Sequence, residues 1–410
     1  MRLGVGCPFV RRGGTARLLH QAPVLALVLG CALVLPAAVE GQDCIYVLTR
    51  LDGAVTIVER ASGTVIGAVP LTECPQPQCM PTGLALTVDA QRAYVPRQDN
   101  GNLYVLNPLQ GTAIDTVDVG SSPSAATLTP NGASLYVTNL ASKSVSVIAT
   151  ASNVVVDTID VGERPRAVAV TPDGTTVFVG NSSSANVSVI RVADGMVFDP
   201  IAVGRGPAGI AVTPNGASAY VTNGSESSVS VIDVASRTVT RTIPVGQSPR
   251  GVAVTPDGAS AYVTNVLDGT LSPIDVSAGT AGAPITVGTG PVAVAVTNDG
   301  TTAYVANLSD NTLSVVDVGS RAVDTIDGVS APFALALGPC PVRPTPTPTS
   351  CVGDCSGDGT VAVNELITGV NIALNSLPIS ACPAFDDDGS ETVTVSELIR
   401  AVNNALSNCQ

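Results

Sequence analysis

The segment Thr-Pro-Asp-Gly-Ala-Ser-Ala-Tyr-Val-Thr-Asn at residues 255–265 decides the fold, because related segments return every 42 residues. The Tyr-Val-Thr-Asn tetrad that ends it also stands at residues 136–139 and 220–223. Degenerate tetrads extend the register in both directions, once a six-residue excess around residues 74–79 is allowed for. The seven copies begin at Tyr46, Tyr94, Tyr136, Phe178, Tyr220, Tyr262 and Tyr304. A period of about 20 to 50 residues indicates a solenoid, a propeller or another array of units, none of which buries its apolar face alone.

Each repeat holds four short runs rich in Val, Ile and Tyr, separated by turns of Pro, Gly, Asn and Asp. In the copy that starts at Val161 these runs are residues 167–170, 177–179, 187–190 and 201–203. Such runs are typical of antiparallel strands, and four strands in about 40 to 45 residues predict one blade of a β-propeller. The tetrad tyrosines and valines are expected to form the packing between blades. The tetrad asparagines stand where a strand meets a loop and are expected to hydrogen-bond the turn.

The two ends of the repeat array complement each other. Residues 46–48 form a tetrad-like strand that lacks the strand found before it in every other copy, and residues 333–337 supply that strand at the far end. A blade shared by both ends removes the free sheet edges that would invite aggregation. Aligning both ends on an internal repeat places Cys44 and Cys340 three positions apart across one hairpin turn, which predicts a disulfide between them.

The tetrad, the Thr-Pro-Asp-Gly turn before it and the Val-Ser-Val-Ile-Asp run at residues 229–233 resemble the YVTN family of seven-bladed β-propellers. The resemblance covers residues 42–340. It implies a mainly β fold of seven four-stranded blades, closed by a shared terminal blade, in a secreted or cell-surface protein. It names no ligand, because one fold serves many functions.

Residues 1–41 have the order of a signal peptide, with four arginines, an apolar stretch over residues 23–39 and a site suited to cleavage. Lipoprotein processing at Cys31 is an alternative that the sequence leaves open. An exported chain favours disulfides among the eight remaining cysteines. Cys74 and Cys79, which lie in the six-residue excess, are predicted to pair with each other.

The chain is acidic, with a formal net charge of −14. Removal of residues 1–41 takes away four arginines and one glutamate, which leaves 15 basic and 32 acidic residues. Nucleic acid and anionic membrane surfaces are therefore not expected as partners. Outside residues 1–41, no stretch of the sequence is long and apolar enough to predict a membrane span.

A Pro/Thr-rich linker at residues 341–350 leads to a second module at residues 351–410. This module contains two acidic segments, 32 residues apart, with the spacing of calcium-binding loops. The first offers Asp354, Ser356, Asp358, Thr360 and Glu365, and the second offers Asp386, Asp388, Ser390, Thr392 and Glu397. A helix is predicted after each loop, at residues 366–374 and 398–406. Because Glu391 stands where the first loop has Gly359, the second site is expected to bind calcium more weakly.

Paired calcium loops with one helix after each, behind a Pro/Thr linker, are similar to dockerin modules. The resemblance implies a small α-helical domain, two calcium ions and a cohesin-like partner. Another surface or extracellular protein, or a glycan, is the alternative partner. Four cysteines add a disulfide framework whose three possible pairings stay open: Cys351, Cys355, Cys382 and Cys409.

For the propeller, the sequence favours binding over catalysis. The single histidine, His20, lies in the predicted signal peptide, so the remaining chain has no histidine for a Ser-His-Asp triad, a Cys-His pair or a metal site. Variable loops on one face of a rigid ring are typical of a binding platform. Four arginines beside the inner strands on that face suit a carboxylate or a sulfated sugar: Arg164, Arg166, Arg205 and Arg250.

We therefore expect a secreted or cell-surface binding or display protein, not an enzyme, whose propeller is tethered through a calcium-stabilised tail. Two alternatives remain. One is a lactonase-like hydrolase, since some seven-bladed propellers are lactonases. The other is a purely architectural surface-layer protein.

Overall fold

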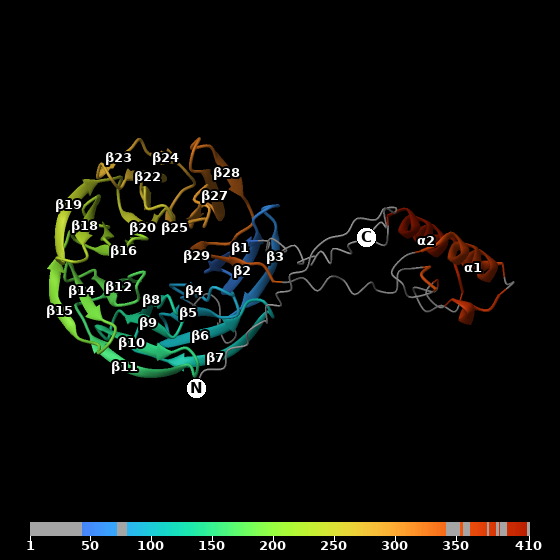
Figure 1. Ribbon diagram of the computed structural model, residues 1–410, viewed down its shortest axis with the longest axis horizontal. Coiled ribbons are helices and arrows are strands. Elements are labelled where there is room, and N and C mark those ends of the chain that lie inside the picture. Colours follow the sequence, from blue (N-terminus) through green and yellow to red (C-terminus); the bar gives the residue numbers. More distant parts are fainter. Residues whose placement is uncertain are drawn as a thin grey trace, which may run out of the picture. The chain divides into compact units, whose positions relative to one another are not determined.

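The computed structural model describes residues 43–71, 80–341, 353–355, 361–374, 377–382, 385 and 392–407. Between residues 43 and 341 it contains seven antiparallel sheets, arranged as blades around a ring (Figure 1). In each sheet the strands follow one another from an inner strand at the centre of the ring to an outer strand at its rim. The predicted mainly β, seven-bladed propeller with four-stranded blades is confirmed.

We number the blades in chain order and give their strands from the inner to the outer edge. Blade 1 consists of β29 (Pro332–Pro339), β1 (Asp43–Thr49), β2 (Ala54–Glu59) and β3 (Val65–Pro70). Blade 2 consists of β4 (Ala85–Leu86), β5 (Ala93–Arg97), β6 (Asn102–Asn107) and β7 (Thr112–Asp118). Blade 3 consists of β8 (Pro123–Leu128), β9 (Ser134–Asn139), β10 (Ser144–Ala149) and β11 (Val154–Asp160). Blade 4 consists of β12 (Pro165–Val170), β13 (Thr176–Asn181), β14 (Asn186–Arg191) and β15 (Val197–Ala202).

Blade 5 consists of β16 (Pro207–Val212), β17 (Ser218–Asn223), β18 (Ser228–Asp233) and β19 (Thr238–Pro244). Blade 6 consists of β20 (Pro249–Val254), β21 (Ser260–Asn265), β22 (Thr270–Asp275) and two short outer pieces, β23 (Thr280–Ala281) and β24 (Ile285–Thr286). Blade 7 consists of β25 (Pro291–Val296), β26 (Thr302–Asn307), β27 (Thr312–Asp317) and β28 (Val323–Ile326).

The outer strand of blade 6 is split because of a proline in its neighbour. β24 pairs with Thr270 and Leu271, and β23 pairs with Ile274 and Asp275, so the ladder is interrupted at Pro273. Proline has no N–H to donate to a strand ladder. The blade therefore keeps its outer layer only on either side of that residue.

Both ends of the array meet in blade 1, as predicted. β29 pairs antiparallel with β1, with Ala336 opposite Tyr46. The Tyr46 hydroxyl donates a hydrogen bond of 2.6 Å to the Pro339 carbonyl oxygen. The predicted disulfide joins Cys44 and Cys340, whose Cα atoms are 4.9 Å apart. The ring is thus closed by backbone hydrogen bonds and by one covalent bond.

The aromatic residue of each tetrad packs between its own blade and the next, which confirms the predicted packing role. Tyr136 of blade 3 belongs to one apolar cluster with Val177 and Ile190 of blade 4. Tyr304 of blade 7 belongs to one cluster with Val47 of blade 1. Large aromatic side chains bury much apolar area, so this repeated contact is a main source of stability for the ring.

The tetrad asparagines bond across a hairpin and not to the turn, which corrects the prediction. In blade 5, Asn223 Nδ2 donates to the hydroxyls of Ser228 at 3.0 Å and Ser230 at 2.9 Å, both on the neighbouring strand. The same side chain lies against Gly204, where an added Cβ would be 2.5 Å from the Asn223 side chain. Blades 3, 4, 6 and 7 repeat this arrangement. A buried amide therefore bonds the two strands of a hairpin, and the glycine lets the loop that enters the blade pack against it.

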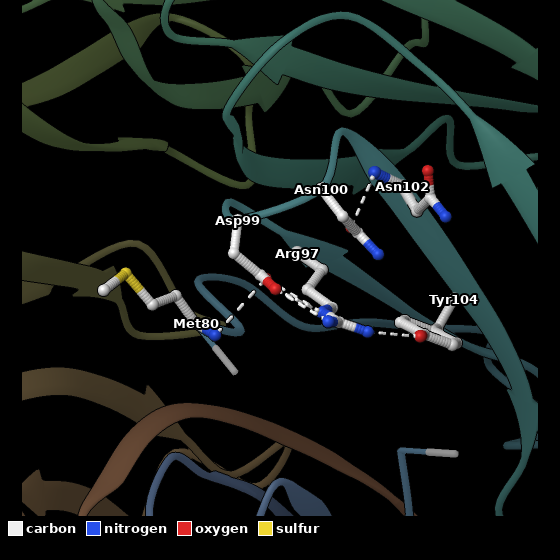
Figure 2. A network of polar contacts seen from close by, with 6 residues as sticks. All are labelled: Met80, Arg97, Asp99, Asn100, Asn102 and Tyr104. Atoms are coloured by element: carbon white, nitrogen blue, oxygen red, sulfur yellow. Dashed lines mark hydrogen bonds and ion pairs between the residues drawn. The ribbon is translucent and has the colours of Figure 1, made fainter. Parts of the chain in front are cut away.

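Blade 2 replaces this amide with an ion pair (Figure 2). Arg97 stands in the tetrad position of the asparagine, and its guanidinium donates to the Asp99 carboxylate at 2.7 Å and to the Tyr104 hydroxyl at 2.5 Å. Tyr104 lies seven residues after Arg97, which is the separation between Asn223 and Ser230. The Met80 amide also donates to Asp99, at 3.4 Å. Arg97 therefore has a structural role in this blade.

The described part of the C-terminal module contains two helices, α1 (Val363–Ala373) and α2 (Val395–Ser407), and the 3-10 turn η1 (Ile379–Ala381). Both helices begin three residues before the predicted starts. The Glu365 carboxylate accepts the Ala362 N–H at 2.8 Å, and the Glu397 carboxylate accepts the Thr394 N–H at 2.7 Å, so each glutamate satisfies a backbone donor at its helix start. A disulfide joins Cys355 to Cys382.

Several predictions fall on residues that the structure does not describe. They concern the signal peptide at residues 1–41, the Cys74–Cys79 pair, most of the linker at residues 341–350, and the pairing of Cys351 and Cys409. Within the described ranges, neither helix is long and apolar enough to cross a bilayer.

Candidate functional site

A cavity of about 460 Å³ lies at the mouth of the ring, where the inner strands begin. Every blade contributes to it. One position of the repeat, the second residue of the inner strand or its equivalent in blade 2, lines the cavity in six blades and in the closing strand: Thr82, Ser124, Arg166, Ala208, Arg250, Val292 and Phe333. We call this set the mouth ring. At this one repeated backbone position, the blades carry side chains of very different chemistry.

The residue after each member of the mouth ring is small, because the inner strands approach one another closely there. A Cβ at Gly209 would collide with the Arg250 carbonyl oxygen, and a Cβ at Gly251 would be 2.9 Å from the Cα of Ala293. The hydroxyl of Thr222 donates to the same Arg250 carbonyl at 2.8 Å, from the neighbouring blade. Close packing and this bond hold the backbone that presents Arg250.

Three arginines reach the cavity from separate elements. Arg166 and Arg250 belong to the mouth ring, and Arg50 directly follows β1. The Arg50 Cζ atom lies 4.1 Å from the centroid of the Phe333 ring, and the Arg250 Cζ atom lies 4.3 Å from it. Both distances are typical of cation–π contacts. Arg164 also lines the cavity, at a φ of 54° in the loop before β12.

Burial and mutual repulsion disfavour the protonated forms of the cavity arginines. Burial lowers the pKa of Arg50, Arg166 and Arg250. The charge of Arg166 lowers the pKa of Arg50 and of Arg250 further. A guanidinium nevertheless stays protonated at neutral pH. Among the described residues, none of these three side chains has a carboxylate within ion-pair distance.

The structure brings together three of the four arginines that the sequence predicts. Arg164, Arg166 and Arg250 line the cavity, but Arg205 does not. Its side chain is 74% exposed and pairs with Glu226 at 2.9 Å. Among the lining residues that the sequence did not indicate, Arg50 and Phe333 contribute most to the chemistry of the cavity. Arg50 follows a tetrad-like strand at the position that holds Leu140 in blade 3, and this substitution was the available signal.

Four of the predicted calcium ligands are described: Asp354, Glu365, Thr392 and Glu397. The other six lie outside the described residues: Ser356, Asp358, Thr360, Asp386, Asp388 and Ser390. In the first loop, the Glu365 carboxylate accepts the Cys355 N–H at 2.9 Å, which brings the loop's last ligand position beside its first, Asp354. A loop that surrounds one ion needs this closure. The described residues alone contain no cluster of three potential metal ligands.

Two family models match parts of the propeller. The model described as a YNCE-like beta-propeller matches residues 158–260, and the model described as Lactonase, 7-bladed beta-propeller matches residues 42–197. The second match includes Arg50, Arg164 and Arg166. No curated protein matches the chain in sequence.

Solved structures share the fold at low sequence identity. Hydrazine synthase of Kuenenia stuttgartiensis is similar over 62% of this chain and 88% of its own, with a TM-score of 0.57 and 21% identity. A functionally unknown protein from Desulfotomaculum acetoxidans DSM 771 is similar over 73% of this chain and 99% of its own, with a TM-score of 0.62 and 17% identity. With the sheet topology, these similarities define the class: a seven-bladed β-propeller.

Proposed function

We propose that this protein is a secreted ligand-binding protein whose propeller holds a small ligand in the cavity at its mouth. The observation that carries the proposal is the contrast between a repeated scaffold and a varied mouth ring. The proline before each member and the small residue after it recur around the ring, whereas the members themselves range from alanine to arginine and phenylalanine. A rigid scaffold that presents varied side chains in one cavity is a common arrangement for binding.

A steric variant tests this function. Ala208→Trp should fill the cavity and keep the fold, because the same position holds Phe333 in blade 1 and Arg250 in blade 6. We expect the wild type to be retained by at least one member of an array of glycans and organic acids. The variant should lose that retention while melting at a similar temperature. Equal retention of both proteins would contradict a site in the cavity.

For the C-terminal module, we propose a calcium-stabilised, dockerin-like tether that binds a cohesin-like protein or another extracellular protein or glycan. Three observations support it: the ligand spacing of the two loops, the helix that follows each loop, and the buried carboxylates of Glu365 and Glu397 at the helix starts. When bound, calcium would supply the charge that holds the acidic loops closed. The disulfides are compatible with secretion.

Calorimetric titration of the whole chain with calcium tests the tether. Glu365→Ala should weaken calcium binding more than the matched variant Glu397→Ala, because Gly359 favours the tight turn of the first loop and Glu391 does not favour that of the second. Chelation should increase amide exchange in α1 and α2 and leave the propeller unchanged. A chain that takes up no calcium would remove this part of the proposal.

A second candidate is a hydrolase that acts on lactones, which the lactonase family match favours. The groups in the cavity favour binding, because a protonated guanidinium can hold and polarise an oxyanion but does not accept a proton as a general base would. Assay of the wild type and Arg166→Gln against a panel of lactones separates the two candidates. Turnover that falls with the substitution would establish the hydrolase.

A further inference from the structure

The cavity arginines differ from other arginines of the same chain in lacking acidic partners. Arg191 pairs with Asp194 at 2.5 Å, and Arg205 pairs with Glu226 at 2.9 Å. The chain is rich in acids, with 33 Asp and Glu against 19 Lys and Arg. Even so, Arg50, Arg166 and Arg250 meet in one cavity without a carboxylate from the described ranges. Their charge is therefore available to a ligand.

The contacts with Phe333 leave the hydrogen-bond donors of two guanidiniums available. In Arg50 and Arg250, the guanidinium carbon lies over the face of the aromatic ring. A guanidinium that stacks on an aromatic ring can still donate hydrogen bonds from the N–H groups in its own plane. Within the described residues, neither guanidinium donates a hydrogen bond, and planar forks of this kind match the oxygens of carboxylate, sulfate and phosphate groups.

The number of arginines in the cavity favours a ligand with more than one negative charge. Holding these guanidiniums in one partly buried cavity is unfavourable: burial is the main cause of their lowered pKa values, and the charges of neighbouring arginines, Arg164 among them, lower them further. An anion with a single charge would offset only part of this repulsion. An anion with two or three charges offsets most of it and can reach arginines from blades 1, 4 and 6 at once.

From this arrangement we infer that the cavity binds a compact multivalent oxyanion, with Arg50, Arg166 and Arg250 as its ligating residues. The inference rests on the proposed binding function and specifies its ligand class. Two sources share this chemistry: a free polycarboxylate, and the sulfated end of a glycan. The cavity volume of about 460 Å³ lies in the range of small-molecule sites and accommodates either.

Isothermal titration at low ionic strength tests the inference, with citrate, inorganic sulfate, inorganic phosphate and a sulfated disaccharide as probes. Citrate or the disaccharide should bind, and the stronger of the two identifies the source. Arg166→Gln and Arg250→Gln should each weaken binding about tenfold to a hundredfold, since each removes a charge-assisted contact. Added salt should weaken binding to the wild type.

Two matched variants complete the design. Arg205→Gln removes an arginine from the same face that is paired and outside the cavity, and it should bind like the wild type. Ala208→Trp should bind none of the probes. Melting curves of the ligand-free variants verify that each is folded.

The inference is overturned if none of the anions binds, or if Arg166→Gln and Arg250→Gln bind them as tightly as the wild type. Its failure is separable from that of the proposed function. Suppose that a neutral ligand binds the wild type and Arg166→Gln but not Ala208→Trp. The cavity would then bind a ligand of another class, and only the inference would fail. If Ala208→Trp still bound both the anions and the neutral ligand, the inference and the proposed function would both be wrong.

Discussion

Arg97 and Arg166 belong to the same ring of blades but lie in opposite surroundings. The Arg97 side chain is 6% exposed and is satisfied by Asp99 and Tyr104 (Figure 2). Its hydrogen bond with Asp99 raises its pKa. Arg166 lines an open cavity beside other arginines, and burial together with the charge of Arg164 lowers its pKa. The residue type is the same, and only the partners differ.

This difference separates a charge that the fold needs from a charge that the fold tolerates. Removing one partner of a buried pair leaves the other without compensation, so the pair supports stability as a unit. Removing one of several like charges relieves repulsion instead. Perturbed groups that do not help the fold are candidates for function. The opposite effects expected at Arg97 and Arg166 make this distinction measurable.

The largest effect should come from opening the scaffold away from the arginines. Cys44→Ala combined with Cys340→Ala removes a crosslink with a sequence separation of 296, and it should lower the free energy of unfolding by about 3–5 kcal/mol, the upper part of the usual range for loss of a native disulfide. Cys44 and Arg50 lie about 20 Å apart along an extended strand. Anion binding at a temperature where the variant is folded should therefore not change. Urea unfolding and calorimetry measure the two effects, and an unchanged unfolding midpoint contradicts the closure role.

Arg97→Gln should lower the free energy of unfolding by about 2–4 kcal/mol, because it leaves the Asp99 carboxylate without its main partner. Urea unfolding of the variant measures this. Arg205→Gln serves as the control, since an exposed ion pair contributes about 1 kcal/mol or less. If the two variants were equally stable, Arg97 would not be a structural residue.

Most of the scaffold is predictable from the sequence because it is repeated. Seven copies of one pattern of strands and turns indicate seven blades, and the missing first strand of the array indicates that the ends share one. The tetrad asparagines were misassigned, because pattern alone cannot show that Asn223 reaches Ser230 across a hairpin. The split strand at Pro273 was also missed, since the surrounding pattern is otherwise regular.

The site is less predictable because its composition depends on what the repeats do not share. Arg166 and Arg250 can be found because they interrupt a run of small and apolar residues at an inner strand. Arg205 stands in the loop before an inner strand, as Arg164 does, but Glu226 on an adjacent loop neutralises it. Arg50 belongs to the incomplete first copy, and its place beside Phe333 follows only from closure of the ring. Partners from distant repeats decide which arginine is available.

A smaller effect on stability should appear at acid pH, and only at the Arg97–Asp99 pair. Burial opposes ionisation of Asp99, but its hydrogen bonds with Arg97 outweigh this and leave its pKa below the ordinary value. For a depressed carboxyl pKa, the stabilisation is present above the unfolded pKa of about 3.9 and is lost as the pH falls through the lower folded value. Melting curves from about pH 5 to about pH 2 cover this titration. Over that range the wild type should lose more stability than Asp99→Asn. Parallel losses in the two proteins would mean that the pair does not form.

The smallest effect should have the opposite sign. Arg166→Gln removes a charge that disfavours the protonated forms of Arg50 and Arg250, and no cation–π contact of Arg166 is lost with it among the described residues. Stability in urea should stay level or rise by up to about 1 kcal/mol. Because guanidiniums stay protonated in acid, this difference should not vary between neutral pH and acid pH. A clear loss of stability would show that Arg166, like Arg97, supports the fold, and it would end the contrast between the two arginines. A gain in stability together with weaker anion binding is the result expected of a residue kept for its ligand.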